Sequence, residues 1–337
     1  MTMMHYGKLN YQNKILKNSL HRRKTALMTQ DAQTYPFQVA ALYRFVPIAD
    51  IPALRAQIYA FADENVPSIC GTLLLAPEGI NGTIAAHPED MDKMVAFLDE
   101  TLGVRTADEP ACEFKFSHAT HQPFNRFKVR PKKELITLRK PEADPHACVG
   151  EYVSPEQWNA LIDDPDVVLV DTRNDYETKV GTFEGAIDPD IEIFTEFPDW
   201  VEKNLDPKKH KKVAMFCTGG IRCEKASSYM LAHGFENVYH LKGGILKYLE
   251  TIPADQSKWN GDCFVFDQRV AVGHGLQESD WAVCHGCREP LSAEDCERAE
   301  FEQGVSCHHC HGDLTSEKLA ARRQRQAHYA ERYAEEH

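Results

Sequence analysis

The sequence predicts a multidomain protein of mixed α+β and α/β class: a βαββαβ domain, an α/β domain built on a parallel sheet, and a small region organised by four cysteines. Three observations predict it. Segments with strand and helix periodicity follow one another in the order βαββαβ across residues 37–117. Continuous apolar runs of strand length come next, as in buried parallel strands. Two CxxC pairs lie near the C-terminus.

The first domain is expected over residues 34–140. Its apolar residues alternate in the segments that we assign to strands and recur at helical spacing in the segments between them. The expected elements are a strand at Phe37–Val46, a helix at Ile51–Glu64, strands at Ile69–Ala76 and Ile80–Ala86, a helix at Pro88–Leu102 and a strand at Cys112–Ser117. This order is the ferredoxin-like arrangement.

The α/β domain is expected over residues 150–255, after a proline-bearing linker. Buried parallel strands are predicted at Val167–Val170, Lys212–Phe216 and Asn237–Leu241. Helical segments lie between and after these strands, which predicts a parallel sheet with helices on both faces. Ser154-Pro155-Glu156-Gln157 has the pattern of a capping box with proline at the first helical position, so a helix should begin there.

Cys217 is the strongest candidate for chemistry, because it directly follows a predicted strand. The loop Cys217-Thr218-Gly219-Gly220-Ile221-Arg222 leads into a helix expected from about Arg222 to His233. The amides of a glycine-rich loop, the helix N-terminus and Arg222 all favour an anion at this edge of the sheet. The Cys217 thiol should therefore have a lowered pKa and react as a thiolate, or hold a persulfide as its anion. The alternative is a buried structural cysteine.

Cys223 lies in the first turn of the same predicted helix. One interpretation is a packing residue, because a helical turn should direct the side chain away from the loop centre. The other is a secondary thiol that resolves an oxidised or persulfidated Cys217. We favour packing.

The C-terminal CxxC pairs are separated by 19 residues, a spacing typical of a structural zinc site with four cysteine ligands. Cys296 and neighbouring histidines are less favoured as ligands. The expected zinc-binding region covers residues 260–314, and residues 315–337 form an Arg-rich helix or a frayed polar tail. The expected zinc ligands are Cys284, Cys287, Cys307 and Cys310.

A basic segment closes the first domain. Residues 124–140 hold seven Lys or Arg against one Glu, with two phenylalanines among them. Two interpretations stay open: an edge strand whose lysines discourage aggregation, and an RNA-facing patch that offers cations to phosphates and rings to bases. The residues expected to bind RNA are Lys128, Arg130, Lys132 and Lys133.

The overall composition limits the function classes. The net charge of −13 argues against indiscriminate nucleic-acid coating, and no apolar run is long enough to cross a bilayer. Eleven cysteines without a secretory signal favour a reducing compartment, which predicts a cytoplasmic protein. Residues 1–33 form a basic leader that we expect to be disordered; its first 29 residues hold six Lys or Arg and no acidic residue.

The cysteine loop and its surroundings resemble the single-domain rhodaneses. Asp171-Thr172-Arg173, Tyr176-Glu177 and Glu184-Gly185-Ala186 correspond to motifs of that family, although Thr182-Phe183-Glu184 replaces its usual G-H-I. The whole chain resembles the bacterial tRNA uridine(34) hydroxylases more closely over residues 37–312. That resemblance is carried by Leu75–Gly82, by the run Cys217-Thr218-Gly219-Gly220-Ile221-Arg222-Cys223-Glu224-Lys225, and by Phe266-Asp267-Gln268-Arg269-Val270.

The resemblance implies a tRNA-modifying oxidoreductase that hydroxylates C5 of the wobble uridine with molecular oxygen, through Cys217. In a conceivable route, addition of the thiolate at C6 makes C5 electron-rich toward oxygen. No flavin or haem motif is found, so neither cofactor is expected. One alternative is a thiosulfate or persulfide sulfurtransferase that uses the same loop. Another is a non-catalytic RNA-binding adaptor, against which the intact Cys217 and Arg222 count.

Overall fold

The structure, a computed structural model, describes residues 35–102 and 114–335. The predicted combination of a βαββαβ domain, a parallel-sheet domain and a C-terminal cysteine cluster is confirmed. The predicted basic leader, residues 1–33, lies outside the described residues, as does the start of the strand predicted at Cys112–Ser117. Within the described ranges, no helix is both long and apolar enough to span a membrane.

The first domain has the predicted element order and one further strand. Its five-stranded sheet has the strand order β4-β1-β3-β2-β5, in which β5 runs parallel to β2 and the other neighbours are antiparallel. The added strand is the edge strand that the basic segment had suggested. The elements are β1 (Phe37–Phe45), α2 (Ile51–Asn65), β2 (Cys70–Ala76), β3 (Gly79–Ala86), α3 (Pro88–Leu102), β4 (Lys115–Ala119) and β5 (Phe127–Pro131).

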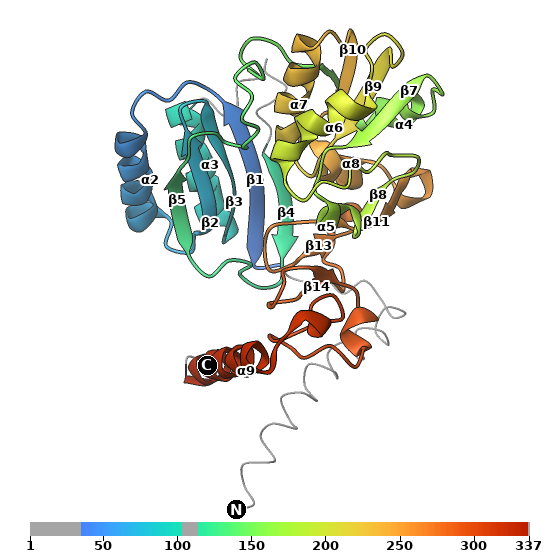
Figure 1. Cartoon of the computed structure of the whole chain (residues 1–337). Helices are drawn as coiled ribbons and strands as arrows, with labels where there is room; N and C mark the ends of the chain where they lie inside the picture. Colours follow the sequence, from blue (N-terminus) through green and yellow to red (C-terminus); the bar gives the residue numbers. More distant parts are fainter. Residues whose placement is uncertain (1–34, 103–113, 336–337) are drawn as a thin grey trace, which may run out of the picture. The chain divides into compact units, whose positions relative to one another are not determined.

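Helices α2 and α3 cover one face of this sheet (Figure 1). Alternate strand residues such as Leu42, Leu73 and Ile84 point into the core beneath them. The residues between, such as Tyr43 of β1 and Lys128 of β5, therefore belong to the opposite face.

The second domain holds a four-stranded parallel sheet with the order β6-β10-β9-β7. Val213 and Met215 of β9 face the core under α6 and α7, whereas Ala214 and Phe216 face the core under α4 and α8. This alternation confirms helices on both faces. The elements are β6 (Glu151–Val153), α4 (Pro155–Ile162), β7 (Val167–Asp171), α6 (Phe197–Asn204), β9 (Lys212–Phe216), α7 (Ile221–Ala232), β10 (Asn237–Leu241) and α8 (Gly244–Thr251).

Helix α4 begins at Pro155, as predicted, but the proposed capping box is wrong. The Ser154 side chain makes no capping hydrogen bond to the helix. Proline at the first helical position lacks the N–H group that would need a partner, so the helix start depends less on a cap.

The remaining elements are short, except for the 20-residue helix α9. They are α5 (Asp175–Thr178), β8 (Gly181–Phe183), β11 (Trp259–Gly261), β12 (Cys263–Phe264), β13 (Ala271–Val272), β14 (Ala282–Val283), β15 (Pro290–Leu291) and α9 (Ser316–Glu335). Helix α9 settles the choice between a helix and a frayed tail at the C-terminus in favour of a helix. Two-stranded sheets pair β11 with β8, β12 with β13 and β14 with β15.

Charged side chains join the first domain to the second. Lys225 of α7, whose side chain is 3% exposed, lies 3.0 Å from Glu78 and 2.7 Å from Glu134. Arg269 is paired with Asp267 and donates hydrogen bonds to Ser117 and to the carbonyl of His118 in β4. Because a buried charge is costly without a partner, the contacts of Lys225 fix the first domain against α7, and those of Arg269 fix it against the turn between β12 and β13.

Candidate active site and metal centre

Cys217 lies where the sequence predicts it, between the end of β9 and the first turn of α7. Gly220 caps α7 with φ +101°, a left-handed conformation that favours glycine. A Cβ atom at this position would also lie 2.9 Å from the Tyr43 hydroxyl of β1. The Gly220 N–H is thereby turned back to donate a hydrogen bond to the Cys217 sulfur at 3.1 Å.

Helix α8 holds the loop from the other side. The N–H groups of Ile245 and Leu246 donate to the carbonyls of Cys217 and Thr218 at 3.0 and 3.1 Å. Gly244 allows this approach, because a Cβ there would lie 2.6 Å from the Cys217 carbonyl oxygen. Because the carbonyls of Cys217 and Thr218 accept hydrogen bonds from α8, the N–H groups of the loop can point toward the sulfur.

These surroundings lower the pKa of Cys217 to about 6. Burial acts in the opposite direction, since it disfavours a charged sulfur. The Cys223 thiol, the Arg222 charge and the backbone N–H groups of Cys223 and Arg222 stabilise the thiolate more than burial destabilises it. A thiolate is the nucleophilic form of cysteine, so the group is ready to react at neutral pH.

Cys223 corrects one expectation. Its thiol is fully buried in the core that also contains Cys217, which supports the favoured packing role, but its side chain lies beside the Cys217 sulfur instead of pointing away from the loop. Burial and the neighbouring Cys217 raise the pKa of Cys223 well above its ordinary value. Cys223 therefore stays a neutral donor while Cys217 carries the charge. The first turn of α7 starts so close to Cys217 that an inward-facing residue of that turn reaches the sulfur.

Arg222 is near the sulfur, as predicted, but most of its hydrogen bonding is directed elsewhere. Its guanidinium lies 2.7 Å from Glu177 and is almost fully buried. Thr218 donates a second hydrogen bond to Glu177 at 3.2 Å. Arg222 thus ties the reactive loop to α5 and contributes a positive charge beside the thiolate.

The Asp-x-Arg motif has a structural explanation. Asp171 and Arg173 form a fully buried ion pair at 2.6 Å, and Arg173 also donates to the carbonyls of Glu177 and Gly181. The pair fixes the segment that presents Glu177 to Arg222.

Glu224 is the functional candidate that the sequence analysis missed. It is 1% exposed and accepts hydrogen bonds from the hydroxyls of Tyr43 at 2.8 Å and Tyr152 at 2.9 and 2.8 Å. Burial is the main cause that raises the pKa of Glu224 to about 7, and the negative charge of Cys217 adds to it. The sequence feature that could have indicated a role for Glu224 is its position in the run Cys217–Lys225, which contains the reactive cysteine. Nothing in the sequence connected it to Tyr43, which lies in the first domain.

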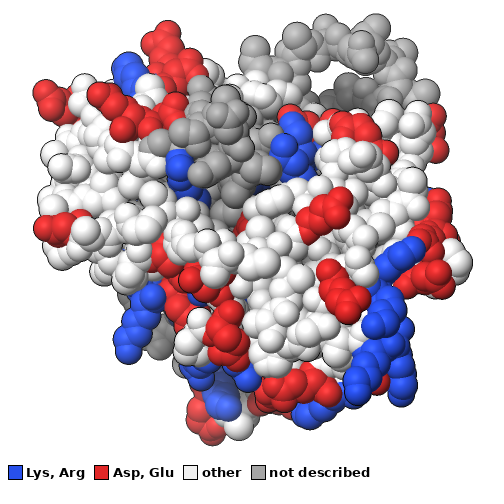
Figure 2. All heavy atoms as spheres, turned by 90° about the horizontal axis from the view of Figure 1, so that it is seen from above, with Lys and Arg blue, Asp and Glu red and all other residues white. Residues whose placement is uncertain are grey.

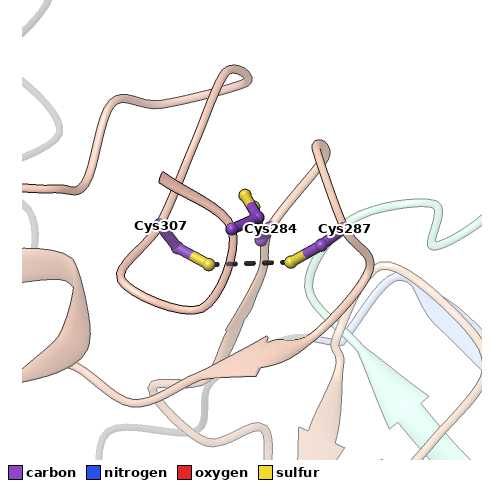
Figure 3. A group of neighbouring side chains, drawn as sticks. Cys284, Cys287 and Cys307 are labelled. Carbon is purple, nitrogen blue, oxygen red and sulfur yellow. Dashed lines mark hydrogen bonds between the residues drawn. The ribbon is translucent and has the colours of Figure 1, made fainter. Parts of the chain in front are cut away.

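The four C-terminal cysteines come together as predicted, and Figure 3 labels three of them, Cys284, Cys287 and Cys307. Their sulfur atoms all lie within 4.8 Å of one another, with Cys284 3.9 Å from Cys310 and Cys287 3.6 Å from Cys307. Cys296 packs beside the cluster without belonging to it. This arrangement can bind a metal ion, because four sulfurs converge on one point.

Helix α9 supports this cluster. Arg322 donates to the Cys310 sulfur at 3.4 Å and to the carbonyl of Val305 at 3.0 Å, and Arg323 pairs with Glu302. Such contacts outside the ligand shell orient the ligands and balance the negative charge of thiolates.

Part of the basic segment forms the edge strand β5, and several of its Lys and Arg side chains are exposed to solvent. Phe127 and Val129 of β5 pack into the core, which puts Lys128 and Arg130 on the other face. Burial and the positive charges of Arg126 and Arg130 together lower the pKa of Lys128. Glu134, the acidic residue of the segment, is paired with Lys225 instead. Figure 2 shows acidic residues scattered over one face of the molecule, with Lys and Arg in small groups.

Comparisons with known proteins cover most of the chain. Residues 37–135 match the model of the UPF0176 acylphosphatase like domain, and residues 154–251 match the rhodanese-like domain. A tRNA uridine(34) hydroxylase of Brucella anthropi is 53% identical over 298 residues, which are 88% of this chain and 95% of that protein. A protein of the same name from Deinococcus radiodurans is 51% identical over 294 residues, 87% of this chain and 95% of that protein.

Proposed function

The chain belongs to the tRNA uridine(34) hydroxylase family, and on that premise we propose that it hydroxylates uridine 34 of tRNA in the cytoplasm, with Cys217 as its reactive group. The resemblance inferred from the motifs is thereby confirmed. The observation that carries the proposal is the extent of the similarity, which covers 88% of the chain and takes in both domains rather than the rhodanese-like domain alone.

The proposed chemistry starts from the Cys217 thiolate. Its addition to C6 of the uracil ring forms a carbon–sulfur bond and moves electron density to C5. C5 then takes one atom of molecular oxygen, while the other is reduced to water by external thiols, which become a disulfide. Loss of the C5 proton and departure of the thiolate restore the ring double bond. The loop N–H groups stabilise the sulfur anion at both ends of this cycle.

The tRNA is proposed to bind partly through Lys128, Arg130, Lys132 and Lys133. Arg130, Lys132 and Lys133 are exposed and Lys128 is half-buried, and within the described ranges none of the four forms an ion pair with a carboxylate. Lysine and arginine in this setting contribute affinity through phosphate contacts.

We assign zinc to the cysteine cluster. Four converging cysteines match the ligand set of structural zinc sites, and filling all four positions leaves none for a substrate. The ion would hold together a region that has a small hydrophobic core.

The experiment that tests the function is mass spectrometry of tRNA nucleosides from cells with and without the gene, grown with aeration. We expect 5-hydroxyuridine and its derivatives to disappear in the deletion strain and to return when the gene is restored. A rhodanese-type loop also suits a sulfurtransferase. If sulfur-modified nucleosides fell while 5-hydroxyuridine persisted, the sulfurtransferase function would replace the one proposed here.

A further inference from the structure

We propose that the exposed ring of Phe266 is the surface on which the target pyrimidine base stacks when it reaches the Cys217 loop. This inference rests on the proposed function and deepens it, because it names the residue that receives the base.

The exposure of Phe266 is the first observation. Three large apolar side chains stay open to solvent in the described part of the chain: Phe266 at 57%, Ile193 at 54% and Ile187 at 42%. Phe266 is the aromatic one. An exposed ring contributes little to folding, because most of its apolar surface remains in water. Exposed aromatic rings are what RNA-binding proteins offer to unstacked bases.

The ring is presented by a rigid turn. The Val265 N–H donates to the Val270 carbonyl at 2.8 Å, and the Val270 N–H donates to the Asp267 carbonyl at 3.0 Å. The buried pair of Asp267 and Arg269 closes the turn at 2.6 Å. A side chain on a turn held in this way is oriented before any ligand binds, which lowers the entropic cost of binding.

The ring also lies beside the reactive loop. The Arg222 guanidinium carbon is 6.0 Å from the centre of the Phe266 ring. The same guanidinium stabilises the Cys217 thiolate. Cys217 itself is 1% exposed, whereas Thr218, Gly219 and Ile221 of its loop are partly exposed. A base stacked on Phe266 would therefore lie beside Arg222, in the loop that holds the sulfur.

A purely structural role for the ring explains less. A cation–π contact at 6.0 Å is at the outer limit of that interaction, and Arg222 already has Glu177 as its partner. Phe264 packs edge-on against Phe266 at 5.3 Å, which leaves most of the ring uncovered. Stacking tolerates any base, so Phe266 holds the base and leaves the selection of uridine to other groups.

The test is a double-mutant cycle on binding. Wild-type protein and the Phe266→Ala variant are each titrated with an anticodon stem–loop RNA that carries uridine at position 34, and with the same RNA that carries an abasic residue there. The wild type should prefer the uridine RNA on the order of 5- to 150-fold. Phe266→Ala should remove most of that preference, because the cycle isolates the contact between ring and base.

Two further variants sharpen the test. Phe266→Trp should keep the preference, since tryptophan also stacks. Ile193→Ala, which removes an equally exposed apolar side chain, should behave as the wild type. Alkylation of Cys217 by iodoacetamide should be equally fast in all variants, which shows that the loop is intact.

The outcomes separate the two proposals. A wild type that binds both RNAs equally, or a Phe266→Ala variant that keeps the full preference, overturns the stacking inference even if 5-hydroxyuridine is formed. A preference that depends on Phe266 supports the inference even if the nucleoside analysis rejects the hydroxylase function.

Discussion

The protein places cysteines in two contrasting surroundings. Cys217 lies among N–H donors and beside Arg222, which together favour one thiolate. The four C-terminal sulfurs mainly face one another, so their thiolates need a cation between them. Burial does not distinguish the two, because Cys217 is 1% exposed and Cys307 is 0% exposed. The groups around each sulfur, N–H donors and Arg222 for Cys217 and other sulfurs for the C-terminal cysteines, distinguish a reactive thiol from a metal ligand.

The largest effect is expected from Cys217→Ser, which should abolish the modification. The loop brings the pKa of a thiol into the neutral range, but it cannot do so for an alcohol, which stays protonated. The measurement is 5-hydroxyuridine in tRNA from a deletion strain that expresses the variant. The tRNA affinity of the purified variant should stay close to that of the wild type. Normal 5-hydroxyuridine levels with Cys217→Ser would refute the nucleophile role.

Cys287→Ser tests the other half of the comparison. It should release the metal and unfold the C-terminal region, because structural zinc binding is worth about 10–16 kcal/mol in small zinc domains. Elemental analysis and proteolysis of the region measure the loss. Cys296→Ser is the matched control, and it should keep the metal. Wild-type protein purified without chelators and found free of zinc would contradict the assignment.

A smaller effect is expected from removing the basic group of β5. Changing Lys128, Arg130, Lys132 and Lys133 together to Gln should weaken tRNA binding and reduce the slope of log affinity against log salt by about 3. Changing Lys203, Lys208, Lys209 and Lys211 to Gln removes the same charge from another exposed region and serves as the control. If the slope of log affinity against log salt were equal in the two variants, β5 would be only a solvated edge strand with no specific role in tRNA binding.

The smallest effect concerns the pH profile of Cys217. Its alkylation rate should rise as pH increases through about 6, because the thiolate forms there. The thiolate forms first, because the pKa of Glu224 is raised to about 7, so Glu224 is still largely neutral in this pH range. Glu224→Gln should therefore leave the midpoint of the rate profile close to that of the wild type, as should the exposed Glu236→Gln control. A clear shift to lower pH in Glu224→Gln would show that Glu224 is ionised before Cys217 and would contradict this order of titration.

Most of the fold follows from local patterns in the sequence. The helix at Pro88–Leu102 and the strands at Lys212–Phe216 and Asn237–Leu241 agree with their predicted limits, because their periodicity is strong and their ends carry turn residues. The cysteine cluster was predictable for a similar reason, since CxxC spacing alone sets the geometry of each pair.

The missed parts of the site depend on contacts between distant segments. Tyr43 and Glu224 are 181 residues apart, and no local pattern connects them. Cys223 packs in the core as favoured, but the direction of its side chain was predicted wrongly, because that direction depends on where the first turn of α7 starts relative to the sulfur. Phe266 was visible as part of a motif, but its exposure is a property of the folded chain.

The contacts of helix α7 limit how far the rhodanese-like domain can be treated as a portable module. Lys225 has both of its carboxylate partners in the segment before residue 140, and Glu224 accepts a hydrogen bond from β1. In residues 150–255 expressed alone, the cysteine loop would remain, but Lys225 would lose both carboxylates, and Glu224 would keep Tyr152 and lose Tyr43. Grafting this loop into a different rhodanese-like domain would therefore transfer the motif without its electrostatic environment.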